Sequence, residues 1–173
     1  MPFVYVCPLS RIAATVESSG ASHLVSLIND GALVVRPQSI PEANHLFLGI
    51  NDITEPQDGM VLPGEEHVRQ LIAFAESWER RQPMVVHCYA GISRSTAAAF
   101  ITVCATQPQR GEAEIAQRLR RASRFATPNA LLVAIADDIL GRNGRMVDAI
   151  TAIGRGEMAI ESVPFALPLE ERA

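Results

Sequence analysis

The segment from Met84 to Cys104 constrains the fold more than any other part of the chain. It begins with an apolar, β-branched run, Met84–Val86, which has the length and composition of a buried strand. A short stretch containing Gly91 follows, and the alanine-rich residues 96–104 then have the composition of a helix. Because strands and helices alternate in α/β folds, the sequence predicts a strand–loop–helix unit here.

The loop of this unit combines an anion site with a reactive thiol. The first N–H groups of a helix lack partners within the helix, and the helix dipole adds partial positive charge at that end. A loop curled over the helix end brings further N–H groups there, and the Arg94 guanidinium suits two phosphate oxygens. Cys88 begins the loop, so its sulfur is expected to face this positive environment as a thiolate. A thiolate held beneath a phosphorus atom is an activated nucleophile.

The same residues resemble a known signature. The run His87-Cys88-Tyr89-Ala90-Gly91-Ile92-Ser93-Arg94-Ser95 separates a cysteine from an arginine by five residues, as in the cysteine-dependent protein tyrosine phosphatases. The form HCxAGxSRS is similar to the dual-specificity subgroup. This resemblance extends over about residues 1–140. It implies an α/β fold of the protein tyrosine phosphatase type, in which helices flank a central, mostly parallel sheet.

The rest of the chain shows the alternation of elements that such a fold requires. Strands are predicted at residues 3–7, 23–28 and 45–50, and helices at 11–18, 65–80, 112–123, 127–140 and 143–153. Thr127 and Pro128 are expected to cap and open the helix that they begin. Residues 1–155 are predicted to form a single phosphatase domain that includes a C-terminal helix. Residues 156–173, with two prolines, are expected to form a loosely held tail.

By resemblance, each residue of the loop has a role in phosphate chemistry. Cys88 would attack phosphorus and form a phosphocysteine. Ser95 would hydrogen-bond the thiolate and help it to leave, or would simply cap the helix. His87 would hold the loop without contacting substrate. Phosphate, and in its place sulfate or vanadate, would be bound by Arg94 and by the backbone N–H groups of Tyr89, Ala90, Gly91, Ile92 and Ser93.

Hydrolysis also needs an acid that protonates the leaving oxygen, and two residues compete for this role. Asp52 directly follows the strand at 45–50, so its position is tied to the sheet, and its context is similar to the strand-then-aspartate segment of dual-specificity enzymes. Asp58 lies in the middle of the same loop and resembles the acid loop of another phosphatase branch. Asp52 is the preferred acid and Asp58 the alternative.

Charge and composition narrow the partners and the location. Hydrophobic residues make up 48% of the 173 residues, which is typical of a globular protein. A net charge of −4 argues against nucleic acid as a partner. The three widely spaced cysteines fit a reducing compartment. We expect no signal peptide, no membrane contact and a cytoplasmic location. The histidines show no metal-ligand spacing, and the expected chemistry needs neither a metal nor another cofactor.

A phosphorylated protein or peptide is the expected substrate, because no lysine or arginine lies between Cys88 and Arg94, as is common in lipid and inositol phosphatases of this superfamily. The resemblance implies hydrolysis of phosphotyrosine and leaves phosphoserine and phosphothreonine open. The basic residues of the helix at 112–123 either form a solvated face or steer acidic phosphopeptides, with Arg124 the best candidate for a second phosphate contact. Two alternatives remain: a phosphate-binding module without turnover, and a sulfurtransferase of the rhodanese type.

Overall fold

The structure is a computed structural model that describes residues 2–169. The strands are β1 (Phe3–Pro8), β2 (His23–Ile28), β3 (His45–Gly49), β4 (Met84–Cys88) and β5 (Phe165–Pro168). The helices are α1 (Ile12–Ser19), α2 (Glu65–Ser77), α3 (Arg94–Thr106), α4 (Glu112–Ala122), α5 (Ala130–Ile139) and α6 (Arg145–Ile153), with short 3₁₀ turns at Leu9–Arg11 and Glu42–Asn44.

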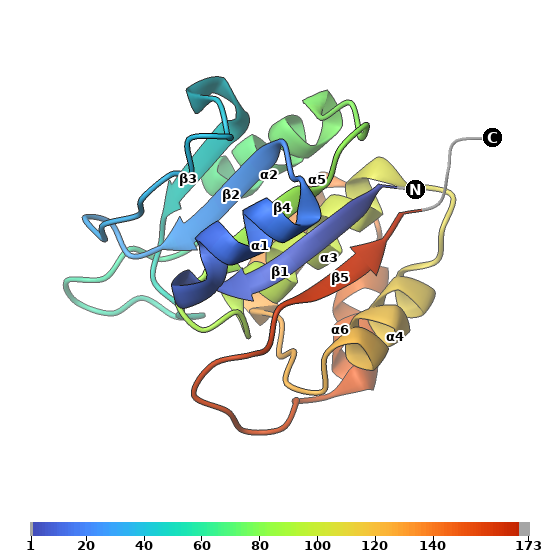
Figure 1. Cartoon of the computed structure of the whole chain (residues 1–173). Coiled ribbons are helices and arrows are strands. Elements are labelled where there is room, and N and C mark those ends of the chain that lie inside the picture. The colour runs from blue at the N-terminus through green and yellow to red at the C-terminus, as the bar shows by residue number, and fades with distance from the viewer. Residues whose placement is uncertain (1, 170–173) are drawn as a thin grey trace.

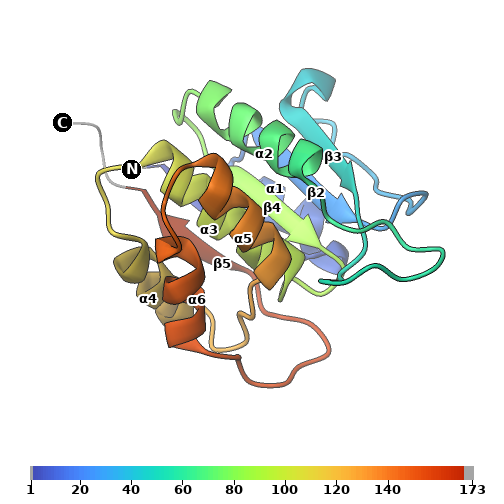
Figure 2. The ribbon, with the colours of Figure 1, turned by 180° about the vertical axis from the view of Figure 1, so that it is seen from behind.

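The strands form one sheet in the order β3-β2-β4-β1-β5. The first four run parallel, and β5 is antiparallel to its neighbour β1. Helix α1 covers one face of the sheet, and the other helices cover the opposite face (Figures 1 and 2). Every residue of the central strand β4 is buried. The predicted α/β fold, a mostly parallel sheet flanked by helices, is confirmed.

Two apolar clusters hold these layers together. The larger one lies between the sheet and helices α2 to α6 and contains Trp78 and Phe100, both fully buried. The smaller one lies under α1 and contains Ile12, Val16 and Leu24. Burial of each such side chain stabilises the fold by about 1.5–3 kcal/mol. None of the helices between residues 2 and 169 is long and apolar enough to span a membrane.

The prediction of a loosely held tail is wrong for residues 165–168. This stretch adds β5 to the sheet and pairs Phe165 with Val6 and Pro168 with Phe3. Proline next to a short apolar run argued against a strand, but an edge strand tolerates proline because one side of it has no neighbour to bond. The stretch between α6 and β5 is thereby fixed at both ends.

The start of α5 also differs from the prediction. Asn129, and not Thr127, is the N-cap, and its side-chain oxygen accepts a hydrogen bond from Leu132 N. Thr127 is used elsewhere: its N–H donates to Ile92 O, and its hydroxyl accepts from Gly156 N. The segment before α5 therefore belongs to the surroundings of the central loop.

Candidate active site

The cysteine loop, residues 88–94, connects the end of β4 to the start of α3. The Gly91 N–H donates a hydrogen bond to Cys88 Sγ at 3.3 Å, and Ser95 Oγ lies 3.1 Å from the same sulfur. Cys88 is only 2% exposed, so these groups rather than bulk water surround its sulfur. Both can donate a hydrogen bond to an ionised sulfur.

The backbone of the cysteine loop is oriented by four hydrogen bonds from outside it. In a trans peptide the N–H points opposite to the C=O of the preceding residue, and the chain has no cis bonds among its described residues. Because these carbonyls face outward, the N–H groups of residues 90, 91, 93 and 94 face inward and form a cradle for an oxyanion. The bonds run from Leu9 N to Tyr89 O (3.1 Å), from Ser162 N to Ala90 O (2.8 Å), from Thr127 N to Ile92 O (2.9 Å) and from Asn129 N to Ser93 O (3.2 Å).

Arg94 is the first residue of α3, and one end of its guanidinium is fixed. Nη1 donates to Asn29 Oδ1 at 2.9 Å and to Ile50 O at 2.8 Å. Nε is buried and has no hydrogen-bond partner among the described residues. A buried, charged donor without a partner is unfavourable by about 1–3 kcal/mol or more, which an anion in the cradle would relieve.

The structure brings Asp52 to the cysteine loop. Ser93 Oγ donates to Asp52 Oδ1 at 2.7 Å, and Asn129 Nδ2 donates to the same oxygen at 3.0 Å. Both bonds end on Oδ1, so Oδ2 is the oxygen that can carry a proton. Asp58 lies in the exposed middle of the loop between β3 and α2. The catalytic role of either residue stays a prediction.

His87 supports the loop as a neutral imidazole. Burial lowers the pKa of His87 to about 4. Its Nδ1 lies 3.2 Å from Cys88 O, which only accepts, so Nδ1 carries the hydrogen. Nε2 then accepts from Ser26 Oγ at 2.6 Å, and Ser26 Oγ lies 2.8 Å from His45 Nε2. His87 thus fixes the carbonyl that begins the loop and carries no positive charge at neutral pH.

Sequence reasoning did not identify four residues that hydrogen-bond the site residues or the cysteine loop: Ser26, Asn29, Asn129 and Ser162. Asn29 directly follows β2, and side chains after neighbouring parallel strands meet at one edge, so topology could have identified it. Asn129 lies in the helix predicted at 127–140, to which the sequence assigned no contact with the loop. Ser26 and Ser162 carry no sequence signal, because their contacts depend on the pairing of β2 with β4 and of β5 with β1.

Gly91 is the residue at which the loop tolerates no side chain. Its φ is +70°, and a Cβ there would lie 2.5 Å from Ser162 Oγ and 2.9 Å from the backbone of Cys7 and Pro8. We expect Gly91→Ala to weaken vanadate binding at least about tenfold, because displaced N–H groups no longer match the oxyanion. Isothermal titration calorimetry measures this change.

Gly20→Ala is the matched control for this substitution. Gly20 also has a positive φ, +66°, but a Cβ there would meet nothing within 4 Å. It ends α1, away from the cysteine loop. Equal losses of vanadate affinity in the two variants would show that general backbone strain, and not the packing behind the loop, sets the affinity.

Comparison with known proteins places this geometry in a family. Residues 54–126 match the sequence model of the family Protein-tyrosine phosphatase. The chain is 39% identical over 82 residues to the tyrosine-protein phosphatase yvh1 of Schizosaccharomyces pombe; this match covers 43% of the chain and 23% of the relative, so the chain spans about a quarter of that protein's length.

Solved structures of phosphatases share the fold. Human DUSP28 is 17% identical, with a TM-score of 0.60 over 81% of this chain and 89% of that one. The human tyrosine phosphatase-like serine/threonine/tyrosine-interacting protein is 19% identical, with a TM-score of 0.61 over 81% and 92%. Sequence match and fold agree: both support the resemblance to the cysteine-dependent protein tyrosine phosphatases, and the chain has the fold of their dual-specificity members.

Proposed function

We propose that this protein is a phosphatase that hydrolyses phosphotyrosine in proteins through a phosphocysteine intermediate. One observation carries the proposal: Cys88 Sγ lies 3.1 Å from Ser95 Oγ and 3.3 Å from Gly91 N, beneath a loop in which four carbonyls accept hydrogen bonds from outside it. The nucleophilic sulfur of Cys88 therefore lies directly beneath the N–H groups that would bind the phosphate oxygens. Asp52, bonded to Ser93 of the same loop, supplies the third component, a proton donor within reach.

The first chemical step forms an S–P bond and breaks the P–O bond to tyrosine. The Cys88 thiolate attacks phosphorus from below, in line with the leaving oxygen. Arg94 and the inward N–H groups stabilise the charge on the three equatorial oxygens. Protonated Asp52 gives its proton to the departing tyrosine oxygen, so tyrosine leaves as a neutral phenol.

The second step releases phosphate and restores the enzyme. Asp52, now a carboxylate, removes a proton from a water molecule as that water attacks phosphorus. The new O–P bond forms while the S–P bond breaks, and the electron pair returns to sulfur. The Ser95 hydroxyl donates a hydrogen bond to the departing Cys88 thiolate.

Asp52→Asn tests the assignment of the acid. Asparagine keeps the oxygen that accepts from Ser93 and Asn129, so the loop should stay in place while the proton is lost. We expect kcat for a phosphotyrosine peptide to fall about 10²-fold. The fall for p-nitrophenyl phosphate should be much smaller, because p-nitrophenolate is a better leaving group and needs less protonation. Steady-state kinetics on both substrates measures the difference.

Asp58→Asn is the control, and we expect it to leave both rates unchanged within about twofold. If Asp58→Asn instead shows the loss confined to phosphotyrosine, Asp58 is the acid.

The same assays also test the alternative functions. Absence of turnover by the wild-type protein on either substrate would contradict the proposed phosphatase activity and favour a phosphate-binding module. Sulfur transfer from thiosulfate would favour the rhodanese alternative. Peptides phosphorylated on serine and threonine decide between tyrosine-only and dual specificity.

A further inference from the structure

The C-terminal strap, residues 154–164, connects α6 to β5 and lies along the rim of the cysteine loop. In Figures 1 and 2 it runs at the end of the sheet where β1 and β4 finish. Its backbone is attached at two points: Glu157 N donates to Arg124 O at 2.9 Å, and Ser162 N donates to Ala90 O of the cysteine loop at 2.8 Å. The strap is therefore a fixed wall of the site.

Close packing confirms that the strap touches its neighbours directly. A Cβ on Gly156 would lie 2.5 Å from the Phe125 backbone. Ser162 Oγ occupies the space that a Cβ on Gly91 would need. Ser10 Oγ donates to Glu161 at 3.0 Å, which joins the strap to the turn after β1.

Despite this packing, the strap exposes apolar side chains to solvent. Met158 is 82% exposed, Ile160 95% and Val163 70%. Nine large apolar side chains are exposed between residues 2 and 169, and six of them belong to the strap, to the cysteine loop or to the loop that carries Asp52. A gathering of this kind marks a surface that contacts another protein, whereas single exposed apolar residues do not. The six are Met60, Val61, Tyr89, Met158, Ile160 and Val163.

Met60 and Val61 lie on the opposite side of the cysteine loop from the strap. Asn51 N donates to Val61 O at 2.9 Å, and Val61 N donates to Asn51 Oδ1 at the same distance. These bonds hold the pair next to Asp52. Apolar side chains therefore flank the site on both walls, with Tyr89 of the loop between them.

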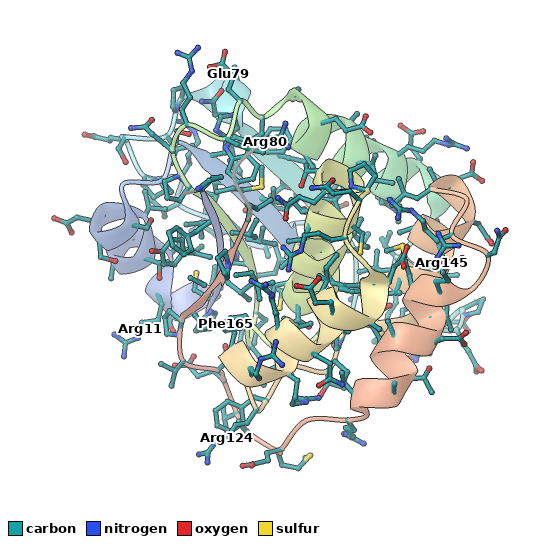
Figure 3. The ribbon with its side chains drawn as sticks, turned by 90° about the vertical axis from the view of Figure 1, so that its right-hand side faces the viewer. Arg11, Glu79, Arg80, Arg124, Arg145 and Phe165 are labelled. Atoms are coloured by element: carbon teal, nitrogen blue, oxygen red, sulfur yellow. The ribbon has the colours of Figure 1, made fainter. Side chains whose placement is uncertain are left out.

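Two arginines beside the strap, Arg120 and Arg124, are already engaged within the protein. Arg124 projects from the surface (Figure 3), stacks on the Phe125 ring and lies 3.4 Å from Glu157. Arg120 donates to the carbonyls of Ser123, Arg124 and Gly154. These contacts speak against a second phosphate on Arg124 and against recognition of strongly acidic peptides. Apart from the exposed Arg155, whose guanidinium lies 3.7 Å from Met158 Sδ, they leave apolar contact as the chemistry that the strap offers.

We propose that the C-terminal strap recognises apolar side chains on either side of the phosphorylated residue of a protein substrate. An extended peptide advances about 3.3 Å per residue, so side chains within three positions of the phosphate reach the strap and the Met60–Val61 wall. Met158 and Ile160 are the specificity-determining residues. This inference rests on the proposed function, because the phosphate must first occupy the cysteine loop.

The test compares two phosphotyrosine peptides, one with leucine and isoleucine at the two positions on each side of phosphotyrosine and one with serine there. Binding is measured by fluorescence anisotropy in the Cys88→Ser background, which needs no turnover, and kcat/KM is measured in the active protein. We expect about tenfold tighter binding of the apolar peptide. The double variant Met158→Ser/Ile160→Ser should reduce this preference to within about twofold.

Leu33→Ser/Val35→Ser is the matched control, since these side chains are similarly exposed but belong neither to the strap nor to the Met60–Val61 wall. It should keep the full preference. Hydrolysis of p-nitrophenyl phosphate reports on the proposed function alone and should be unchanged in both double variants. Equal binding of the two peptides by the wild type would overturn the inference. So would a Met158- and Ile160-dependent dimer in sedimentation, or binding to phosphatidylcholine vesicles, without a peptide preference.

Discussion

Replacing Cys88 with serine is expected to abolish phosphate release while phosphopeptide binding remains. Serine has nearly the same size, so the Gly91 N–H and the Ser95 hydroxyl keep their positions around the side chain. A hydroxyl is not ionised near neutral pH and cannot replace a thiolate as nucleophile. We expect kcat for p-nitrophenyl phosphate to fall by at least about 10⁴-fold. The Kd for a phosphotyrosine peptide, measured by anisotropy, should change by less than about threefold.

Cys104→Ala is the control for this substitution. Cys104 is buried inside α3, and burial raises the pKa of its thiol to about 12, as it does for Cys7. Both thiols stay protonated and shielded, so iodoacetate at neutral pH should modify Cys88 alone, and vanadate should protect it. Mass spectrometry of the digested protein locates the label. Activity that survives in Cys88→Ser above a tenth of the wild-type value would contradict a phosphocysteine pathway.

The parts of the site that sequence reasoning identified are those that lie close together along the chain. Cys88, Gly91 and Arg94 sit in one strand–loop–helix unit, so local geometry defines their relation. Asp52 was preferred because it directly follows a predicted strand and because its context resembles the strand-then-aspartate segment of dual-specificity enzymes. The observed bond from Ser93 to Asp52 agrees with that placement.

Residues that hold the loop from outside carry no local signal in the sequence. Ser162 reaches Ala90 only because β5 pairs with β1, and nothing near Ser162 in the sequence encodes that pairing. Asn29 looks like a turn residue, and its bond to Arg94 depends on the two strands lying side by side. Propensity describes a segment by itself, whereas these contacts depend on which segments become neighbours.

Arg94→Lys should show how much the shape of the guanidinium matters, beyond its charge. Arg94 divides its donors: Nη1 is held by Asn29 and Ile50 O, and the buried Nε has no partner within the described protein. A lysine ammonium has a single nitrogen, so it cannot donate to Asn29 and Ile50 O and at the same time bind two phosphate oxygens. We expect kcat to fall about 10³-fold and vanadate affinity at least about tenfold, although the charge is unchanged.

Two further variants make this prediction specific to the geometry. Arg121→Lys, on the outer surface of α4, should leave kcat unchanged and controls for the loss of a guanidinium in general. Asn29→Ala removes only one anchor of Nη1, so it should lower kcat by less than Arg94→Lys, at an unchanged melting temperature. If Arg94→Lys retains kcat within tenfold of wild type, a positive charge at residue 94 is enough and the guanidinium shape is not required. In that case the cradle of backbone N–H groups, and not the fixed fork of Arg94, must supply most of the stabilisation of the transferring phosphoryl group.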